Sequence, residues 1–401
     1  MKNICLVGQQ GLKEGCRKIM AKFTCPHCYE MYGKNLIKYC CPDCNTIVLA
    51  PSKEPIKCIS SGCGGVATIR LCPMCMVDNG MRNGINEIPR IALETPNLSF
   101  SIVGVSTSGK TNYITIMLDE LMKFSDIRLA MGDQTNETRD HQKYNIQEIK
   151  HGRAPAGTVS GNPIPQIWYI KNLMKKRKGL FGDQTVPTYT FTIYDGAGED
   201  HMTMDPTMVR YIKSSEAFII VLDPLVLEGV RSFVDPQVMK NSLKGDQGVS
   251  ENSTEVVERL VNMLTNIKGL KIGTMLKMPV AVVLTKFDTV INHPAFANTK
   301  VKHPSLSIEN GKVRTEEFEQ IHNEIENWLK NIGEQRFINA LDSSFAKLDR
   351  KGNHSQRHYN FFAVSSYGEP PQEEGAVAKK ITPHRVLDPI LWLFAKNKFI
   401  D

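Results

Sequence analysis

The sequence predicts an α/β protein with a mostly parallel sheet flanked by helices, preceded by a small cysteine-rich module. Two observations indicate this class. Beyond residue 97, short apolar runs of strand length alternate with helical patterns, as is typical of sheets with helical crossovers. All eleven cysteines lie before residue 76, so a separate metal-dependent module is expected near the N-terminus.

The bulk composition narrows the class of protein. Its 401 residues suggest about two or three domains. The longest apolar runs, AFIIVL and ILWLFA, are far shorter than the ~20 residues of a membrane span, and the N-terminus lacks the apolar core of a signal peptide. We therefore expect a cytoplasmic protein without a membrane span. The net charge of +7 is weak evidence for nucleic acid, because eight zinc-bound thiolates would remove about four units of it.

Eight of the cysteines form four closely spaced pairs that predict zinc knuckles. Three of the pairs are CPxC turns, and such a turn supplies two thiolates to a tetrahedral zinc ion. Four pairs complete two sites with no open position, so both zinc ions are expected to be structural. The pairs are Cys25 and Cys28, Cys41 and Cys44, Cys58 and Cys63, and Cys72 and Cys75.

The spacing leaves two ways to combine these knuckles. Intervals of 12, 13 and 8 residues separate them, and the intervals of 12 and 8 suit hairpins. We therefore expect the first pair to join the second and the third to join the fourth, as a double zinc ribbon over residues 20–90. A cross-braced arrangement, as in RING domains, fits the same counts. Cys5, Cys16 and Cys40 are expected to be ordinary apolar residues, since the CPxC form favours Cys41 over Cys40.

The stretch GVSTSGKT, residues 104–111, predicts a phosphate-binding loop between a strand and a helix. Backbone amides at the helix N-terminus would meet the β-phosphate, where the helix dipole favours an anion. Lys110 would reach the β- and γ-phosphate oxygens, and the Thr111 hydroxyl would bind Mg²⁺. The candidate residues are Gly104, Ser106, Thr107, Ser108, Gly109, Lys110 and Thr111.

Motifs after later strands indicate which nucleotide this loop binds. In DGAG, Asp195 would hold Mg²⁺ through a water, and the Gly198 amide would meet the γ-phosphate. In TKFD, Asp288 would accept hydrogen bonds from guanine N1–H and the exocyclic amine, while the Lys286 stem lies over the base. Adenine lacks this donor pair and would leave a desolvated carboxylate unpaired, at a cost of ~1–3 kcal/mol or more.

A last strand ends in SSY, where a backbone amide near Ser366 could contact the guanine oxygen. These motifs all follow strands, and ligands of open α/β sheets bind at the carboxyl ends of strands. The candidate base-side residues are Thr285, Lys286, Asp288, Ser365 and Ser366. Asp223 in VLDP has a similar form and is interpreted as a chance match. An ATPase is the alternative, but it requires that TKFD be accidental.

Together, GVSTSGKT, DGAG, TKFD and SSY resemble the guanine-nucleotide signature of TRAFAC-class P-loop GTPases, over residues 98–398. The zinc module before this core looks like the bacterial double-GTPase group, which is found near other genes in conflict or signalling operons. The resemblance implies a GTPase domain over residues 91–401, after the zinc ribbons and an N-terminal tail of residues 1–19. It also implies GTP or GDP, Mg²⁺ and two structural zinc ions as cofactors.

The resemblance further implies a switch threonine before the DGAG motif. We expect Thr158, in GRAPAGT, to sense the γ-phosphate and Mg²⁺. Thr135 and Thr138 are the alternatives, and a plain loop without this role is another.

The residue after DGAG is Glu199, where small Ras-like proteins have the glutamine that orients the attacking water. A carboxylate facing the γ-phosphate is electrostatically unfavourable, so turnover by this chain alone should be slow. A partner or a second copy would complete the site. The alternatives within the chain are Arg153 as an internal arginine finger and His201 as the water-orienting group.

These motifs favour a regulatory switch whose loops are ordered by GTP and released on hydrolysis. The zinc module would be an adaptor, and an effector, an activator or a second copy would meet the switch region. The alternative is a ribosome- or RNA-associated GTPase whose ribbons bind nucleic acid. Residues 22–90 hold eight basic and five acidic residues and few aromatics, so this alternative is not favoured.

The rest of the sequence predicts the strands and helices of the core and one insertion. The second and third expected strands form a hairpin whose basic tip, KKRKG at 175–179, is expected to be solvated, and contact with an anionic partner is the alternative. A helix over 315–332 should pack on the core rather than present a docking face, and another over 386–399 should close the sheet. The polar segment 225–255 predicts a mobile insertion. The expected strands are 99–103, 164–171, 187–194, 217–222, 280–285 and 360–364.

Overall fold

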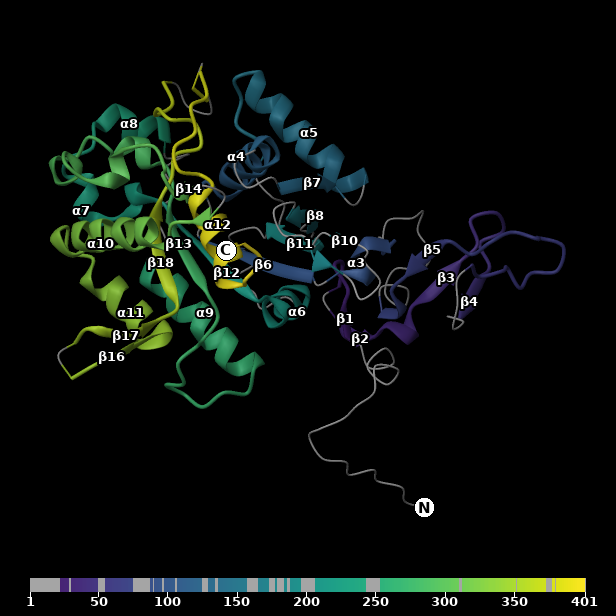
Figure 1. Ribbon diagram of the computed structural model, residues 1–401. Coiled ribbons are helices and arrows are strands. Elements are labelled where there is room, and N and C mark those ends of the chain that lie inside the picture. The colour runs from purple at the N-terminus through teal and green to yellow at the C-terminus, as the bar shows by residue number, and fades with distance from the viewer. Residues whose placement is uncertain are drawn as a thin grey trace. The chain divides into compact units, whose positions relative to one another are not determined.

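The computed structural model divides into two compact units, residues 1–97 and 98–401 (Figure 1). The first unit extends past the expected boundary near residue 90, because Ala92 packs in one apolar cluster with Cys25 and Cys72. The structure describes residues 22–28, 30–49, 55–74, 87–88, 90–95, 97–104, 107–124, 129–133, 136–156, 165–172, 177–178, 184–185, 188–195, 206–242, 253–309, 312–350, 352–372, 377–378 and 380–400. The expected tail of residues 1–19 lies outside them.

The first unit consists of short antiparallel strands around two small apolar clusters that include cysteines. β1 pairs with β2, while β3 lies between β4 and β5 and is antiparallel to both. So few apolar side chains are buried here that we expect metal ligation to provide much of this unit's stability. Its elements are β1 (Lys22–Thr24), β2 (Met31–Gly33), η1 (Lys34–Leu36), β3 (Lys38–Cys40), β4 (Ile47–Leu49), β5 (Ile69–Leu71) and α3 (Arg90–Glu94).

The second unit is built on a seven-stranded sheet in the order β18-β13-β12-β6-β11-β8-β7. β6, β12, β13 and β18 run parallel, whereas β8 is antiparallel to both β11 and β7. This confirms the predicted α/β class, a mostly parallel sheet with helices, and all the predicted strands; β7 is an edge strand that was not predicted. The strands are β6 (Asn97–Val103), β7 (Leu129–Asp133), β8 (Pro165–Asn172), β11 (Thr188–Asp195), β12 (Ala217–Leu222), β13 (Val280–Leu284) and β18 (Tyr359–Ala363).

Helices and short elements complete this unit. The main helices are α4 (Lys110–Lys123), α5 (Asn136–Lys150), α6 (Pro206–Ser214), α9 (Ser253–Ile267), α10 (Thr315–Asn331), α11 (Gln335–Phe345) and α12 (Asp388–Lys396). The short elements are β9 (Arg177–Lys178), β10 (Gln184–Thr185), η3 (Pro224–Val226), α7 (Glu228–Arg231), α8 (Pro236–Ser242), η4 (Phe287–Thr289), η5 (Pro294–Phe296), η6 (Lys300–Lys302), β14 (Ile308–Glu309), β15 (Lys312–Val313), β16 (Ala346–Leu348) and β17 (His354–Arg357).

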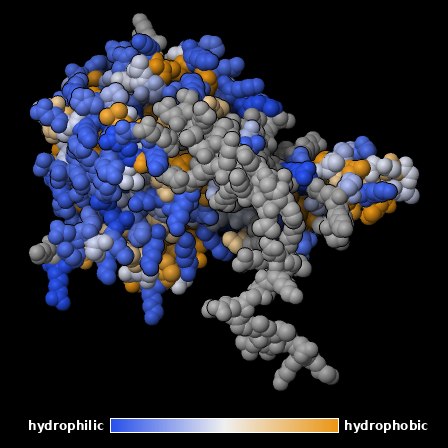
Figure 2. Space-filling model, in the orientation of Figure 1, coloured by the Kyte–Doolittle hydropathy of each residue, from blue (hydrophilic) through white to orange (hydrophobic). Residues whose placement is uncertain are grey.

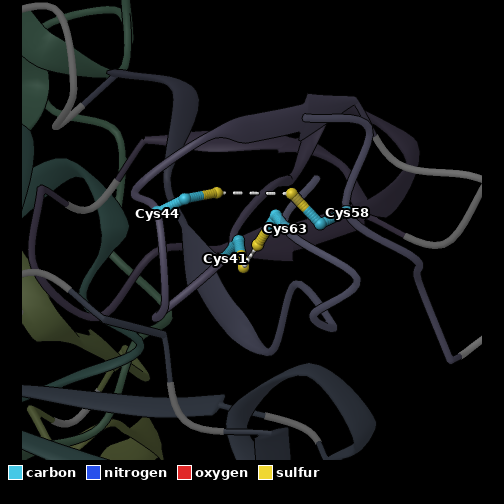
Figure 3. A group of neighbouring side chains, drawn as sticks. All are labelled: Cys41, Cys44, Cys58 and Cys63. Carbon is cyan, nitrogen blue, oxygen red and sulfur yellow. Dashed lines mark hydrogen bonds between the residues drawn. The ribbon is translucent and has the colours of Figure 1, made fainter. Parts of the chain in front are cut away.

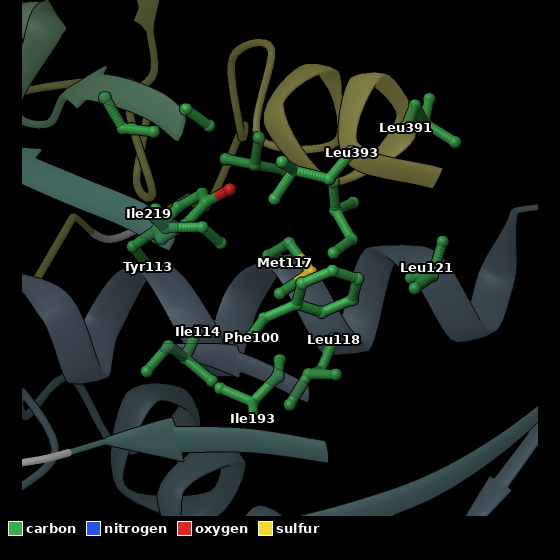
Figure 4. Packing of buried hydrophobic residues seen from close by; sticks show 14 of the residues in the cluster. Phe100, Tyr113, Ile114, Met117, Leu118, Leu121, Ile193, Ile219, Leu391 and Leu393 are labelled. Carbon is green, nitrogen blue, oxygen red and sulfur yellow. The ribbon is translucent and has the colours of Figure 1, made fainter. Parts of the chain in front are cut away.

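The core lies around the central strand β6. The Phe100 ring centroid lies 5.6 Å from that of Phe191 on β11 and 6.1 Å from that of Phe394 on α12. α4 contributes a buried apolar face at helical spacing, which meets residues of the sheet and of α12 (Figure 4). That face consists of Tyr113, Ile114, Met117, Leu118 and Leu121. The helix that follows the phosphate loop is therefore fixed by extensive burial.

The two helices predicted near the C-terminus are present as α10 and α12. The apolar face of α10 is buried and contacts β18, so α10 packs on the core as predicted. Its buried apolar residues are Phe318, Ile321, Ile325, Trp328 and Leu329. On the face of the molecule that Figure 2 shows, the surface over α7, α10 and α11 is mostly hydrophilic.

The predicted mobile insertion at 225–255 was wrong over its first part. Residues 224–242 form η3, α7 and α8, and the apolar side chains of Leu225, Leu227, Val230 and Val234 are buried. These apolar residues are scattered among Gly, Ser, Asp and Asn, which hid the helical spacing in the sequence. Residues 243–252 lie outside the described part of the chain.

None of the helices among the described residues has both the length and the apolar content of a membrane-spanning segment.

Candidate functional site

Seven cysteine thiols of the first unit gather into two clusters, within each of which the sulfur atoms all lie within 4.8 Å of one another. One cluster holds Cys41, Cys44, Cys58 and Cys63, whose side chains turn toward a common centre (Figure 3). The other holds Cys25, Cys28 and Cys72, and Cys75 lies outside the described residues.

The sulfur distances in these clusters fit zinc. The Sγ atoms of Cys41 and Cys63 are 3.6 Å apart, those of Cys44 and Cys58 are 3.4 Å apart, and those of Cys28 and Cys72 are 3.6 Å apart. Four thiolates at the usual Zn–S distance of about 2.3 Å would stand about 3.8 Å apart. Both clusters can therefore hold a tetrahedral zinc ion. Cys40 belongs to neither cluster, as predicted.

Sequential pairing of the knuckles was wrong, and so was the cross-braced alternative. The second pair joins the third, and the first joins Cys72 of the fourth, which is a nested arrangement. The reason is the antiparallel pairing of β3 with β5, in which Lys38 lies opposite Leu71 and Cys40 lies opposite Ile69. Cys72 directly follows β5, so it returns to the beginning of β3 and the first knuckle. Cys41 directly follows β3 and therefore lies at the opposite end of this ladder.

The phosphate loop connects β6 to α4, as its sequence predicts. Gly109 precedes α4 with a φ of 84°, which glycine adopts without strain. A Cβ atom on Gly104 would lie 2.6 Å from the Val221 carbonyl oxygen, so only glycine fits there. The buried Lys110 ammonium donates a hydrogen bond to the Gly104 carbonyl oxygen at 2.9 Å. A buried cation at a helix N-terminus creates a positive site suited to phosphate.

The hydroxyl-bearing residues of this loop differ in their exposure. Thr107 is exposed and has a φ of 63°, and Thr111 is partly buried in the first turn of α4. Ser108 is buried, and its Oγ has no hydrogen-bond partner in the described part of the chain. Ser106 lies outside the described residues.

The TKFD segment is joined to the phosphate loop by a hydrogen bond. Thr285 follows β13, and its Oγ1 donates to the Ser108 carbonyl oxygen at 2.7 Å. Lys286 has a φ of 49°, and its Nζ lies 2.5 Å from Asp223 Oδ2 and 3.1 Å from the Ser242 carbonyl oxygen. The residues predicted to bind phosphate and base are thus held in one connected site.

The TKFD and SSY segments also come together, because the Phe287 amide donates a hydrogen bond to the Val364 carbonyl oxygen at 3.0 Å. Burial raises the pKa of the Asp288 carboxyl, and the Ser365 hydroxyl and the nearby Lys286 ammonium oppose this effect to a smaller extent. Ser365 is buried and pairs through its backbone with His384, at 3.0 and 2.8 Å. Ser366 is half-buried beside it. The carboxylate predicted to read the base is therefore partly desolvated, where an unpaired charge is costly.

Asp223 lies in this candidate site, although sequence analysis set it aside. It was interpreted as a chance match, yet its side chain is buried, pairs with Lys286 and accepts a hydrogen bond from the Leu225 amide at 2.9 Å. β12 and β13 are parallel neighbours in register, so the segments that follow them, which contain Asp223 and Lys286, lie side by side. Predicting this contact requires the order of the strands in the sheet, which local sequence does not show.

The described residues show only part of the predicted switch. β11 ends at Asp195, but the Asp195 side chain and Thr135, Thr158, Gly198, Glu199 and His201 lie outside the described part of the structure. The alternative Thr138 is buried, and its Oγ1 accepts a hydrogen bond from the Ile167 amide at 3.0 Å. Thr138 therefore anchors β8. Arg153 is exposed and binds Glu148 through two hydrogen bonds of 2.7 Å.

Comparison with known proteins adds little to this geometry. No protein-family profile and no curated protein sequence matches the chain. Among solved structures, the small GTPase Arl6 (BBS3) from Trypanosoma brucei, with the bound nucleotide analogue GppNp, matches at 12% sequence identity and a TM-score of 0.30. The match covers 76% of this chain and 99% of that chain. A TM-score this low supports no structural conclusion, so the function proposed below rests on this chain's own residues.

Two double variants test the nested pairing by elemental analysis of the purified chain. We expect about two zinc ions per wild-type chain, and about one in Cys28→Ser with Cys72→Ser, which alters one site only. Cys28→Ser with Cys41→Ser alters both sites and should lose both ions. Sequential pairing predicts the opposite result for the two variants. Fewer than about one zinc ion in the wild-type chain would contradict zinc binding itself.

Proposed function

We propose that the second unit binds and hydrolyses GTP as a regulatory switch. The observation that carries this proposal is the junction of three segments that follow β6, β13 and β18. Thr285 joins the TKFD segment to the phosphate loop, and the Phe287 amide joins it to the Val364 carbonyl oxygen, directly before the SSY segment. These segments lie at the carboxyl ends of parallel strands, where open α/β sheets bind ligands.

On the phosphate side, Lys110 would exchange its bond to the Gly104 carbonyl for the β- and γ-phosphate oxygens. Gly104, Ser106, Thr107, Ser108 and Gly109 would enclose the phosphates. Ser108 Oγ, a buried oxygen without a partner in the described part of the structure, is a further group available to them. Thr111 would hold Mg²⁺ together with Asp195 and Thr158, and the ion would neutralise phosphate charge.

On the base side, Asp288 would accept hydrogen bonds from guanine N1–H and the exocyclic amine. The stem of Lys286, held at its far end by Asp223, would cover the face of the base. A backbone amide near Ser366 would contact the guanine oxygen, since the Ser365 amide already donates to the His384 carbonyl oxygen. Adenine would leave the partly desolvated Asp288 carboxylate without donors, which is the physical basis of the proposed preference.

In the proposed reaction, water attacks the γ-phosphorus and GDP and phosphate are released. Thr158 and the Gly198 amide would hold the γ-phosphate, and their release after hydrolysis would change the switch surface. Glu199 stands where a water-orienting amide is expected, so we propose slow turnover without a partner. Arg153 pairs with Glu148 in the structure, so its use as an internal finger would require that pair to break.

We further propose that the first unit is a zinc-dependent adaptor for a protein partner in a bacterial signalling or conflict system. A cytoplasmic location and an effector, activator or second copy at the switch region belong to the same proposal. The alternative, a ribosome- or RNA-associated GTPase, gains no specific support. The described tyrosines Tyr32 and Tyr39 pack against the cysteine clusters, which leaves them poorly placed as stacking platforms.

Base recognition is tested by Asp288→Asn. The amide offers a donor where the carboxylate offers an acceptor, so GTP should bind about 10- to 100-fold more weakly while xanthosine triphosphate binds more tightly. Calorimetry measures both affinities. Lys110→Ala is the companion variant, and it should weaken both nucleotides because it removes a phosphate contact. Unchanged selectivity in a folded Asp288→Asn protein would contradict the proposed role of TKFD.

The raised pKa of Asp288 predicts a pH dependence of binding. Recognition requires the carboxylate, and this form is lost as the pH falls through a range above the usual Asp value of about 3.9. We therefore expect the affinity for GDP to fall on acidification from about pH 7.5 to about pH 4.5. Asp288→Asn, titrated with fluorescent GDP under the same conditions, should lack the part of this pH dependence that comes from the Asp288 carboxyl. The same change in GDP affinity with pH in both proteins would contradict the proposed role of Asp288.

Turnover is tested by single-turnover GTP hydrolysis over a series of protein concentrations. The isolated chain should be slow, and completion of the site by a supplied arginine could accelerate it by ~10³–10⁵. A fast rate that does not depend on concentration would contradict partner dependence. If Arg153→Ala then abolished that rate, the internal finger would be the correct explanation.

A further inference from the structure

The short helix α8 lies in the segment between β12 and α9 and is held at its start by its own sequence. Pro236 occupies the first helical position, and Asp235 Oδ1 accepts hydrogen bonds from the amides of Gln237 at 2.7 Å and Val238 at 3.4 Å. Val234, just before the helix, is buried. The helix therefore has a defined position from which its C-terminal residues can act.

Asn241, near the end of α8, binds the backbone beyond the SSY segment. Its Nδ2 donates hydrogen bonds to the carbonyl oxygens of Pro371 at 3.2 Å and Gln372 at 2.7 Å. Gln237, one turn earlier, donates from Nε2 to Asn241 Oδ1 at 2.9 Å. This bond orients the Asn241 side-chain amide so that its NH₂ group faces both loop carbonyl oxygens.

Ser242, the last residue of α8, binds the other base-side segment. Its carbonyl oxygen accepts a hydrogen bond from Lys286 Nζ at 3.1 Å, and the same ammonium pairs with Asp223. The Ser242 Oγ is enclosed and has no hydrogen-bond partner among the described residues. Two consecutive residues of α8 thus hold the segments that follow β13 and β18.

We infer that the C-terminal end of α8 is a third wall of the guanine site, and that Asn241 and Ser242 are positioning residues that slow nucleotide release. This inference rests on the proposed function, because it concerns the same base pocket. In the proposed site the base would lie between the Lys286 segment and the loop after Ser366, so its release would require these two segments to separate. The bonds from Asn241 and Ser242 tie both segments to one helix and so oppose that separation.

The test is the release of fluorescent GDP from the full-length chain. Asn241→Ala loses both hydrogen bonds to the loop and the orienting bond from Gln237, and should release GDP about tenfold faster. Gln237→Ala loses only the orienting bond and should release GDP about threefold faster. Asn241→Asp should be at least as fast as Asn241→Ala, because its carboxylate would face two carbonyl oxygens. A helix-stability effect alone would not produce this order.

A matched control exists on α11. Gln335 Nε2 donates to Asn339 Oδ1 at 2.8 Å, which repeats the spacing of Gln237 and Asn241 on an exposed surface. Asn339→Ala should release GDP at the wild-type rate. In GDP-bound Asn241→Ala, hydrogen exchange should increase over residues 365–372 and stay at the wild-type level over residues 110–123, which form α4.

The outcomes separate the inference from the proposed function. If the wild-type chain binds no guanine nucleotide, the proposed function fails and this inference fails with it. If the wild-type chain binds GDP but Asn241→Ala and Gln237→Ala release it at the wild-type rate, only the inference is overturned. Faster release from both variants, with increased exchange over residues 365–372, supports it.

Discussion

The in-register parallel pairing of β6, β12, β13 and β18 is the constraint on which the proposed site depends. Val103 and Ile220 are partners, as are Leu222 and Leu284, and Leu284 and Ala363. The carboxyl ends of parallel strands in register lie at one edge of the sheet. Residues that follow these strands therefore come together there, although they are far apart in the sequence. The buried strands supply the hydrophobic stabilisation, and the polar loops at this edge are held in place by it.

The polar contacts at that edge form one connected network. Thr285 bonds the phosphate loop, Lys286 bonds both Asp223 and the end of α8, and the Phe287 amide bonds the Val364 carbonyl oxygen beside Ser365. A network of this kind places partly desolvated charges beside one another, where each depends on its neighbours for compensation. The first unit buries only small apolar clusters, so we expect metal bound at the nested cysteine sites to stabilise its short strands.

Local patterns predicted the strands, the strand–loop–helix connection at residues 104–111 and α10 well, because each depends on periodicity or on residue types within one short window. Two features were not predictable in this way. The nested cysteine pairing follows from β3 lying against β5, and the role of Asp223 follows from β12 lying against β13. Both depend on strand order, which spacing along the chain leaves open. α8 was missed because the few apolar residues that anchor its segment lie among turn-forming residues.

The most direct test of the central claim is a calorimetric titration of the Mg²⁺-containing wild-type chain with GTP and, separately, with ATP. If the segments after β6, β13 and β18 form a guanine-nucleotide site, GTP should bind about 10- to 100-fold more tightly than ATP, because only guanine supplies donors to Asp288. Equal affinity for the two nucleotides would contradict the proposed guanine specificity, and no binding of either would contradict the site itself.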